Sequence, residues 1–88
     1  MSELHAHRLK RLIMRSMRRG IKEMDLILPP YAAARLDQMD EDALTLYDAL
    51  LNENDHDLYQ WVTGQVGAPA GYSEMIADIQ AHLKTHRV

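Results

Sequence analysis

The chain has 88 residues and no cysteine, so it has room for one small domain, and its fold cannot rely on disulfides or thiolate metal sites. Its net charge is −3, and 26% of its residues are charged, with the two signs unevenly distributed along the chain. No apolar run approaches the roughly 20 residues that cross a bilayer, and the polar start shows no secretory signal, so we predict a bacterial cytoplasmic protein without membrane insertion.

The basic residues gather at the N-terminal end. Residues 1–23 hold seven Lys and Arg against two Glu, a net charge of +5, whereas residues 24–88 hold three Lys and Arg against eleven acids, a net charge of −8. A basic segment on an acidic body is typical of proteins that bind nucleic acid, a membrane surface or an acidic protein patch. It is also expected of a self-complementary fold, in which the basic helix lies over the acidic remainder.

The first predicted helix covers His5 to Arg18. Its apolar residues recur at helical spacing, which predicts one buried stripe with arginines on the other face. Gly20 follows where a left-handed C-cap glycine is expected, since glycine has no Cβ to clash at positive φ. The stripe consists of Leu9, Leu12, Ile13 and Met17.

A second helical stretch starts near Ile21. Pro30 either restarts this helix or kinks it, because proline cannot supply the interior N–H, and helical composition continues to Gln38. Asp40 is a good N-cap for a third helix, since its carboxylate can accept a hydrogen bond from the first turn. The inner face of that helix would carry Ala43, Leu46, Tyr47, Leu50 and Leu51.

Two more helices follow. Asp55 is predicted to cap a fourth helix that ends around Gly64 or Gly67, and Ser73 is predicted to cap a fifth after a loop rich in Gly and Pro. Strand signals are almost absent, so the sequence predicts an all-α fold: a compact five-helix bundle in which residues 1–88 form a single small domain. The inward residues of the last two helices would be Leu58, Trp61 and Val62, then Ile76, Ile79 and Leu83.

Motifs that carry enzymatic chemistry are missing. The four glycines are too scattered for a phosphate loop, and neither a nucleophile elbow nor a thiol is present, so we predict that the chain is not an enzyme. His82 and His86 are four residues apart on one helix, but no third metal ligand is evident, and we interpret both as solvent-facing.

The aromatic residues have two interpretations. Tyr31, Tyr47, Tyr59 and Trp61 lie at helical spacing among leucines, which favours packing over a flavin-stacking or base-stacking site. A partly exposed Trp61 beside acids would also suit a protein interface. Nucleic-acid binding through the arginines of the first helix is less favoured, because the domain as a whole is acidic and matches no recognised signature.

The segment from Arg19 to Glu23 joins the first two predicted helices. Cations at the end of one helix and an acid in the first turn of the next are each favoured by the helix dipole. On spacing alone the segment is therefore a well-made helix junction, with a functional role as the alternative.

Two blocks of sequence resemble a known family. RRGIKEMD resembles the RGxxE signature of the small FAD assembly factors of succinate dehydrogenase, and LLNENDHDLYQWV resembles the second pattern of that family, with paired leucines, two spaced acids and a Trp. The resemblance covers roughly residues 8–83. The chain departs from the family in having His56 between the two acids, where proline is common, and two prolines at 29 and 30, where one is typical.

The resemblance implies a five-helix assembly factor that binds the flavoprotein subunit of succinate dehydrogenase, and in bacteria also that of fumarate reductase. Such a protein promotes covalent attachment of FAD to its partner and binds no cofactor stably itself. The sequence leaves the oligomeric state open, and we expect a monomer that forms a transient heterodimer with its client. Carried over by motif, the partner-binding residues are Arg19, Gly20, Glu23, Asp57 and Trp61.

Two other functions stay open from the sequence. Bacterial relatives of this kind also suggest an antitoxin-like or regulatory interaction protein. A helical nucleic-acid-binding domain that uses the basic segment is the less favoured alternative.

Overall fold

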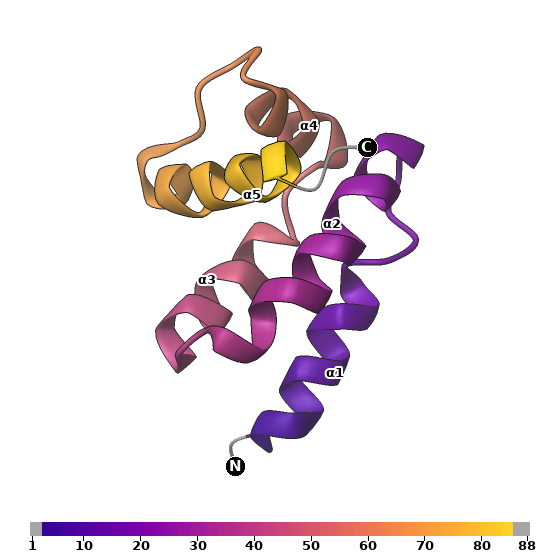
Figure 1. Cartoon of the computed structure of the whole chain (residues 1–88), viewed down its shortest axis with the longest axis vertical. Helices are drawn as coiled ribbons and strands as arrows, with labels where there is room; N and C mark the ends of the chain where they lie inside the picture. The colour runs from indigo at the N-terminus through magenta and orange to yellow at the C-terminus, as the bar shows by residue number, and fades with distance from the viewer. Residues whose placement is uncertain (1–2, 86–88) are drawn as a thin grey trace.

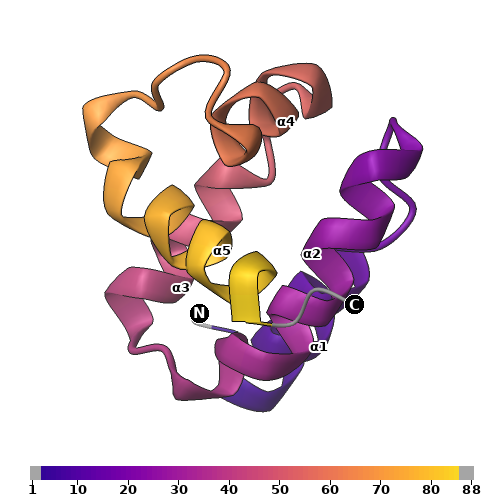
Figure 2. The ribbon, with the colours of Figure 1, turned by 45° about the horizontal axis from the view of Figure 1, so that its top comes forward.

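Helix α2 lies at the centre of the fold and packs against α1, α4 and α5 (Figures 1 and 2). The structure is a computed structural model that describes residues 3–85. Within that range every regular element is helical, which confirms the all-α prediction with five α-helices. In chain order the elements are α1 (His5–Arg15), α2 (Lys22–Arg35), η1 (Leu36–Gln38), α3 (Glu41–Leu50), α4 (Asp55–Thr63), η2 (Ala70–Tyr72) and α5 (Ser73–Thr85), where η marks a short 3-10 helix.

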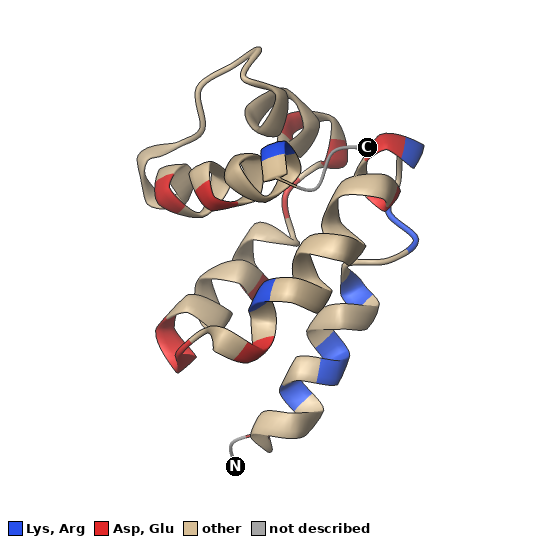
Figure 3. Cartoon of the chain, viewed as in Figure 1, with Lys and Arg blue, Asp and Glu red and all other residues tan. Residues whose placement is uncertain are grey.

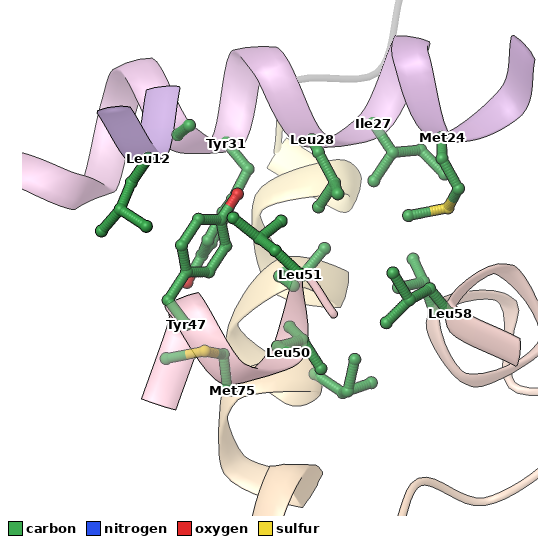
Figure 4. Close-up of a cluster of buried hydrophobic side chains, with 14 of the residues drawn as sticks. Leu12, Met24, Ile27, Leu28, Tyr31, Tyr47, Leu50, Leu51, Leu58 and Met75 are labelled. Atoms are coloured by element: carbon green, nitrogen blue, oxygen red, sulfur yellow. The ribbon is translucent and has the colours of Figure 1, made fainter. Parts of the chain in front are cut away.

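The apolar core forms around one side of α2. Figure 4 shows Met24, Leu28 and Tyr31 of α2 pointing toward side chains contributed by the other helices. Burying a side chain of this size stabilises the fold by about 1.5–3 kcal/mol relative to leaving it in water. The core partners from elsewhere in the chain include Leu12, Tyr47, Leu50, Leu58 and Met75.

Helix α1 ends at Arg15 rather than at the predicted Arg18. The next residue, Ser16, is fully buried, and its hydroxyl bonds to the Leu12 carbonyl at 2.8 Å and to the Tyr47 hydroxyl at 2.5 Å. Burial raises the pKa of Tyr47 to about 12. This contact with α3 fixes the position where the chain leaves the helix.

The predicted stripe on α1 is partly wrong. Leu12 is buried and Leu9 half-buried, but Ile13 and Met17 are 36% and 46% exposed. Ile13 is exposed because α1 turns its arginines toward α3, and Met17 is exposed because the helix ends before it, at Arg15.

Figure 3 shows basic positions along α1 and acidic positions on α3. Three arginines of α1 pair with polar residues on or just beyond α3. Arg8 contacts Glu41 at 2.7 Å, and Arg11 contacts Asp48 at 2.9 Å. Arg15 binds the same Asp48 carboxylate and donates to Asn52 just beyond α3. The basic helix therefore lies over an acidic part of its own chain, as expected of a self-complementary fold.

Helix α2 continues through both of its prolines to Arg35, so of the two alternatives predicted for Pro30, a restart or a kink, the restart is wrong. Because Pro29 and Pro30 have no N–H, they cannot bond to the carbonyls of residues 25 and 26. The helical composition noted up to Gln38 belongs partly to α2 and partly to η1.

The predicted helix caps are partly confirmed. Asp40 accepts a hydrogen bond from the Ala43 N–H at 2.8 Å, as expected, and Gly64 ends α4 with φ 82°. Asn54 caps α4 in place of the predicted Asp55, which is the first helical residue. Ser73 is likewise the first residue of α5, and its hydroxyl donates to the Ala70 carbonyl of η2 at 3.1 Å.

The solvent-facing interpretation of His82 is wrong. His82 is 3% exposed and lies edge-on to Tyr31, with ring centroids 5.8 Å apart. His86 lies outside the described residues. Within residues 3–85 no group of three or more potential ligands could hold a metal ion, and none of the described helices is long and apolar enough to cross a membrane.

Asp48, which pairs with both Arg11 and Arg15, should make the stability of the fold depend on pH. Hydrogen bonding from Arg11 holds the pKa of the Asp48 carboxyl below its ordinary value. A native pKa below the unfolded one gives stability that is present above the unfolded pKa and lost as the pH falls through the native pKa. We expect Asp48→Asn to lower the free energy of unfolding at neutral pH by about 1 kcal/mol, measured by urea denaturation.

The difference in free energy of unfolding between wild type and Asp48→Asn should become smaller once the pH falls below about 4. Asp37→Asn is the matched control, because Asp37 is exposed and has no hydrogen-bond partner in the part of the chain that the structure describes. A difference that stays constant across the acid range would contradict this account of Asp48.

Candidate functional site

Arg19 lies in the loop between α1 and α2, and its side chain points into the protein. The guanidinium Nε donates to Asp55 Oδ1 at 2.8 Å, and the two terminal nitrogens donate to the carbonyls of Arg15 and Leu51 at 2.8 and 2.9 Å. Only 10% of the Arg19 side chain and 15% of the Asp55 side chain are exposed. Each guanidinium nitrogen therefore has an acceptor within the same chain.

Gly20 follows directly and contacts the same carboxylate. Its N–H donates to Asp55 Oδ2 at 2.5 Å. A Cβ added at Gly20 would lie 2.7 Å from that oxygen, closer than real Cβ atoms come to other atoms. Glycine therefore leaves room for this carboxylate, and a larger residue here would have to displace the carboxylate or the loop.

The prediction that Gly20 adopts the left-handed conformation is wrong. Among the described residues, positive φ occurs at Arg18, with φ 55°, and at Gly64. The tight turn after α1 is thus made by an arginine, at some conformational cost. The turn is followed by Arg19, whose N–H donates to the Asp25 carboxylate in the first turn of α2.

Asp55 is the residue of this site whose long-range contacts the sequence does not predict. The sequence predicts a helix cap at Asp55, which is also one of the two spaced acids of the second block. Its partners Arg19 and Gly20 precede it by 36 and 35 residues, so no local signal relates them. The sequence offers one signal for this contact. The first block holds an arginine followed by a glycine, and the second block holds an acid that could pair with them.

Glu23 lies in the first turn of α2, immediately after this loop. Its side chain is exposed and makes no hydrogen bond or ion pair with any residue of the described part of the chain. A carboxylate at this position is favoured by the helix dipole and is available to a partner.

Asp57 and Trp61 of α4 differ sharply in exposure. Asp57 is exposed in the first turn of α4, close in sequence to Asp55. Trp61 is 9% exposed and stacks on Tyr72, with ring centroids 6.1 Å apart, which agrees with the packing interpretation.

The first turns of α2 and α4 lie at the same end of the molecule (Figures 1 and 2), joined by the contacts of Asp55 with Arg19 and Gly20. The structure thus brings Arg19 and Gly20 together with Asp55 and leaves Glu23 and Asp57 exposed on the two adjoining first turns. Trp61 lies deeper, in the core.

Comparison with known proteins agrees with the two-block pattern. A family described as "Flavinator of succinate dehydrogenase" matches residues 10–83. The succinate dehydrogenase assembly factor 2 of Drosophila grimshawi is 41% identical over 81 residues, covering 90% of this chain and 53% of the relative. The assembly factors 2 of Candida glabrata and Saccharomyces cerevisiae are 55% and 53% identical over 53 residues, covering 60% of this chain and 35% and 33% of theirs.

These relatives contradict the prediction of a bacterial cytoplasmic protein. Each of the three is named a mitochondrial protein and comes from a eukaryote. The prediction relied on where the chain begins, and that argument fails because the chain spans only about half, or less, of the length of these relatives. The match over residues 10–83 nevertheless decides the family. The chain belongs to the flavinator of succinate dehydrogenase family.

Proposed function

We propose that the chain binds the flavoprotein subunit of succinate dehydrogenase and promotes covalent attachment of FAD to that subunit. The observation that carries the proposal is the family match over residues 10–83, which includes both the signature block and the second block. The flavoprotein subunit of fumarate reductase is proposed as a second client. The chain would act as a monomer that forms a transient heterodimer.

Glu23 and Asp57 are the proposed direct contacts of this interface. Both are exposed, and they extend from the adjoining first turns of α2 and α4. Because neither has a partner among the described residues, binding requires no internal ion pair to break. The flavoprotein would present cations or N–H donors opposite these carboxylates, since charge complementarity favours both encounter and correct orientation.

The chain is proposed to act as an assembly factor and not as an enzyme. The bond to FAD would form within the flavoprotein, from its own residues, and this chain would stabilise the conformation in which that occurs. Such an effect is a population shift: the chain binds the competent conformation of its partner more tightly than the others. FAD would remain bound to the flavoprotein throughout.

A reconstitution with purified components tests the function. The apo-flavoprotein is incubated with FAD, with or without this chain, and covalent flavin is read as fluorescence in a denaturing gel. We expect at least a severalfold increase in covalent flavin at a fixed early time, because a population shift of about 1.4 kcal/mol changes an equilibrium tenfold. Equal fluorescence with and without the chain, and no measurable complex, would contradict the proposal.

Glu23 provides a test of the interface itself. We expect Glu23→Gln to weaken binding to the flavoprotein by about tenfold, measured by calorimetry, because the substitution removes the charge and keeps the side-chain size. The thermal unfolding of the free chain should change little, since the Glu23 side chain is exposed.

Glu74→Gln is the matched control for Glu23→Gln. Glu74 is also exposed, also lies in the first turn of a helix, and has no partner within the described residues. Equal losses of affinity in the two variants would mean that the effect comes from net charge and not from the proposed contact.

A further inference from the structure

We propose that Asp55 is the positioning residue of this interface, and that Arg19 and Gly20 act through it rather than by touching the flavoprotein. We call Arg19, Gly20 and Asp55 the Asp55 cluster. The inference rests on the function proposed above for the part that concerns the partner, whereas its internal part concerns the free chain alone.

The Arg19 side chain has little left to offer a partner. It is 10% exposed, and each of its three guanidinium nitrogens already donates to an acceptor of the same chain. To contact the flavoprotein it would have to give up the Asp55 carboxylate and leave that charge without its counterion in a largely buried place, which is strongly unfavourable. The role of Arg19 is therefore to hold Asp55 and the two carbonyls in place.

The requirement for glycine at position 20 comes from Asp55 as well. The three nearest heavy atoms to a Cβ built there all belong to Asp55, and the backbone is not in the left-handed region. The carboxylate cannot turn aside freely, because Arg19 holds its other oxygen. A methyl group at position 20 would consequently displace the carboxylate or the loop.

The Asp55 cluster sets the relation between α2 and α4. Asp55 is the first residue of α4, and it fixes a loop that leads within three residues to Glu23 on α2. The Arg19 N–H bonded to Asp25 ties the same loop to the first turn of α2. Movement of this loop would therefore move Glu23 relative to Asp57, although neither residue touches Asp55 in the described contacts.

A double-mutant cycle between Gly20 and Asp55 tests the internal part. The variants are Gly20→Ala, Asp55→Ala and their combination, each measured for unfolding by urea and for binding to the purified flavoprotein. We expect Gly20→Ala alone to weaken binding by about tenfold, and to add less than about twofold in the Asp55→Ala chain, because contacting residues are not additive. Unfolding of the free chain should show the same non-additivity.

The alternative is that Gly20 permits close approach of the flavoprotein backbone. Gly20→Ala would then weaken binding by the same factor in both backgrounds, and that additive result would overturn the proposal. Because the unfolding measurements need no flavoprotein, they test the cluster even if the proposed function fails. If the effects on unfolding are non-additive but the wild-type chain does not bind the flavoprotein, the proposed function is contradicted and the proposed contact between Gly20 and Asp55 is supported.

A second cycle tests positioning against loss of stability. If Asp55 acts by placing Glu23, Asp55→Ala should weaken binding by about tenfold in the wild-type chain, but by less than about threefold in the Glu23→Gln chain. Binding is measured at a temperature at which all variants are folded. Full additivity of the two substitutions would overturn the positioning role.

The matched control breaks another ion pair between α1 and the rest of the chain. Arg8→Gln removes a largely buried arginine side chain that binds Glu41 and Thr45, near the starts of α1 and α3 and away from the loop. We expect it to lower stability and to leave binding to the flavoprotein within about twofold of wild type. A loss of affinity equal to that of Asp55→Ala would show that any destabilisation has this effect, and would also overturn the proposal.

Discussion

One carboxylate ties the loop between α1 and α2 to the first residue of α4. Asp55, the first residue of α4, accepts from the Arg19 side chain and from the Gly20 backbone, and so holds the loop that joins α1 to α2. A largely buried ion pair gains little net stability, because both ions lose water, but it is costly to break and strongly favours one geometry. Arg19 also donates to the carbonyls of Arg15 and Leu51, at the ends of α1 and α3. The cluster therefore contributes more to the path of the chain between helices than to the free energy of unfolding.

The uneven charge of the sequence has a structural explanation in α1. Arg8, Arg11 and Arg15 lie along one side of the helix and pair with acids and amides on or just beyond α3. This interaction turns the helix so that Ile13 remains partly exposed, where hydrophobic spacing alone would have buried it, whereas Met17 lies beyond the end of α1. Electrostatic complementarity between helices thus overrides the apolar pattern in choosing the buried face of α1.

The parts of the fold that sequence could predict are those determined by neighbouring residues. The helical character of all five segments, the Asp40 cap and the end of α4 at Gly64 follow from local propensity and turn chemistry, and the structure confirms them. The end of α1 at Ser16 could not be predicted, because it depends on Tyr47, 31 residues away. The role of Gly20 could not be predicted for the same reason: a helix-end glycine usually adopts positive φ, whereas this one makes room for a distant carboxylate.

The spacing of the two acids in the second block now has a physical meaning. Residues two apart on a helix point in widely different directions, since each residue turns the helix by about 100°. Asp55 can therefore face inward to the loop while Asp57 faces solvent. The first block is divided in the same way, with Arg19 and Gly20 directed toward Asp55 and Glu23 directed outward. The two blocks form one unit in space, in which an internal contact fixes the loop and places one exposed carboxylate from each block at the same end of the molecule.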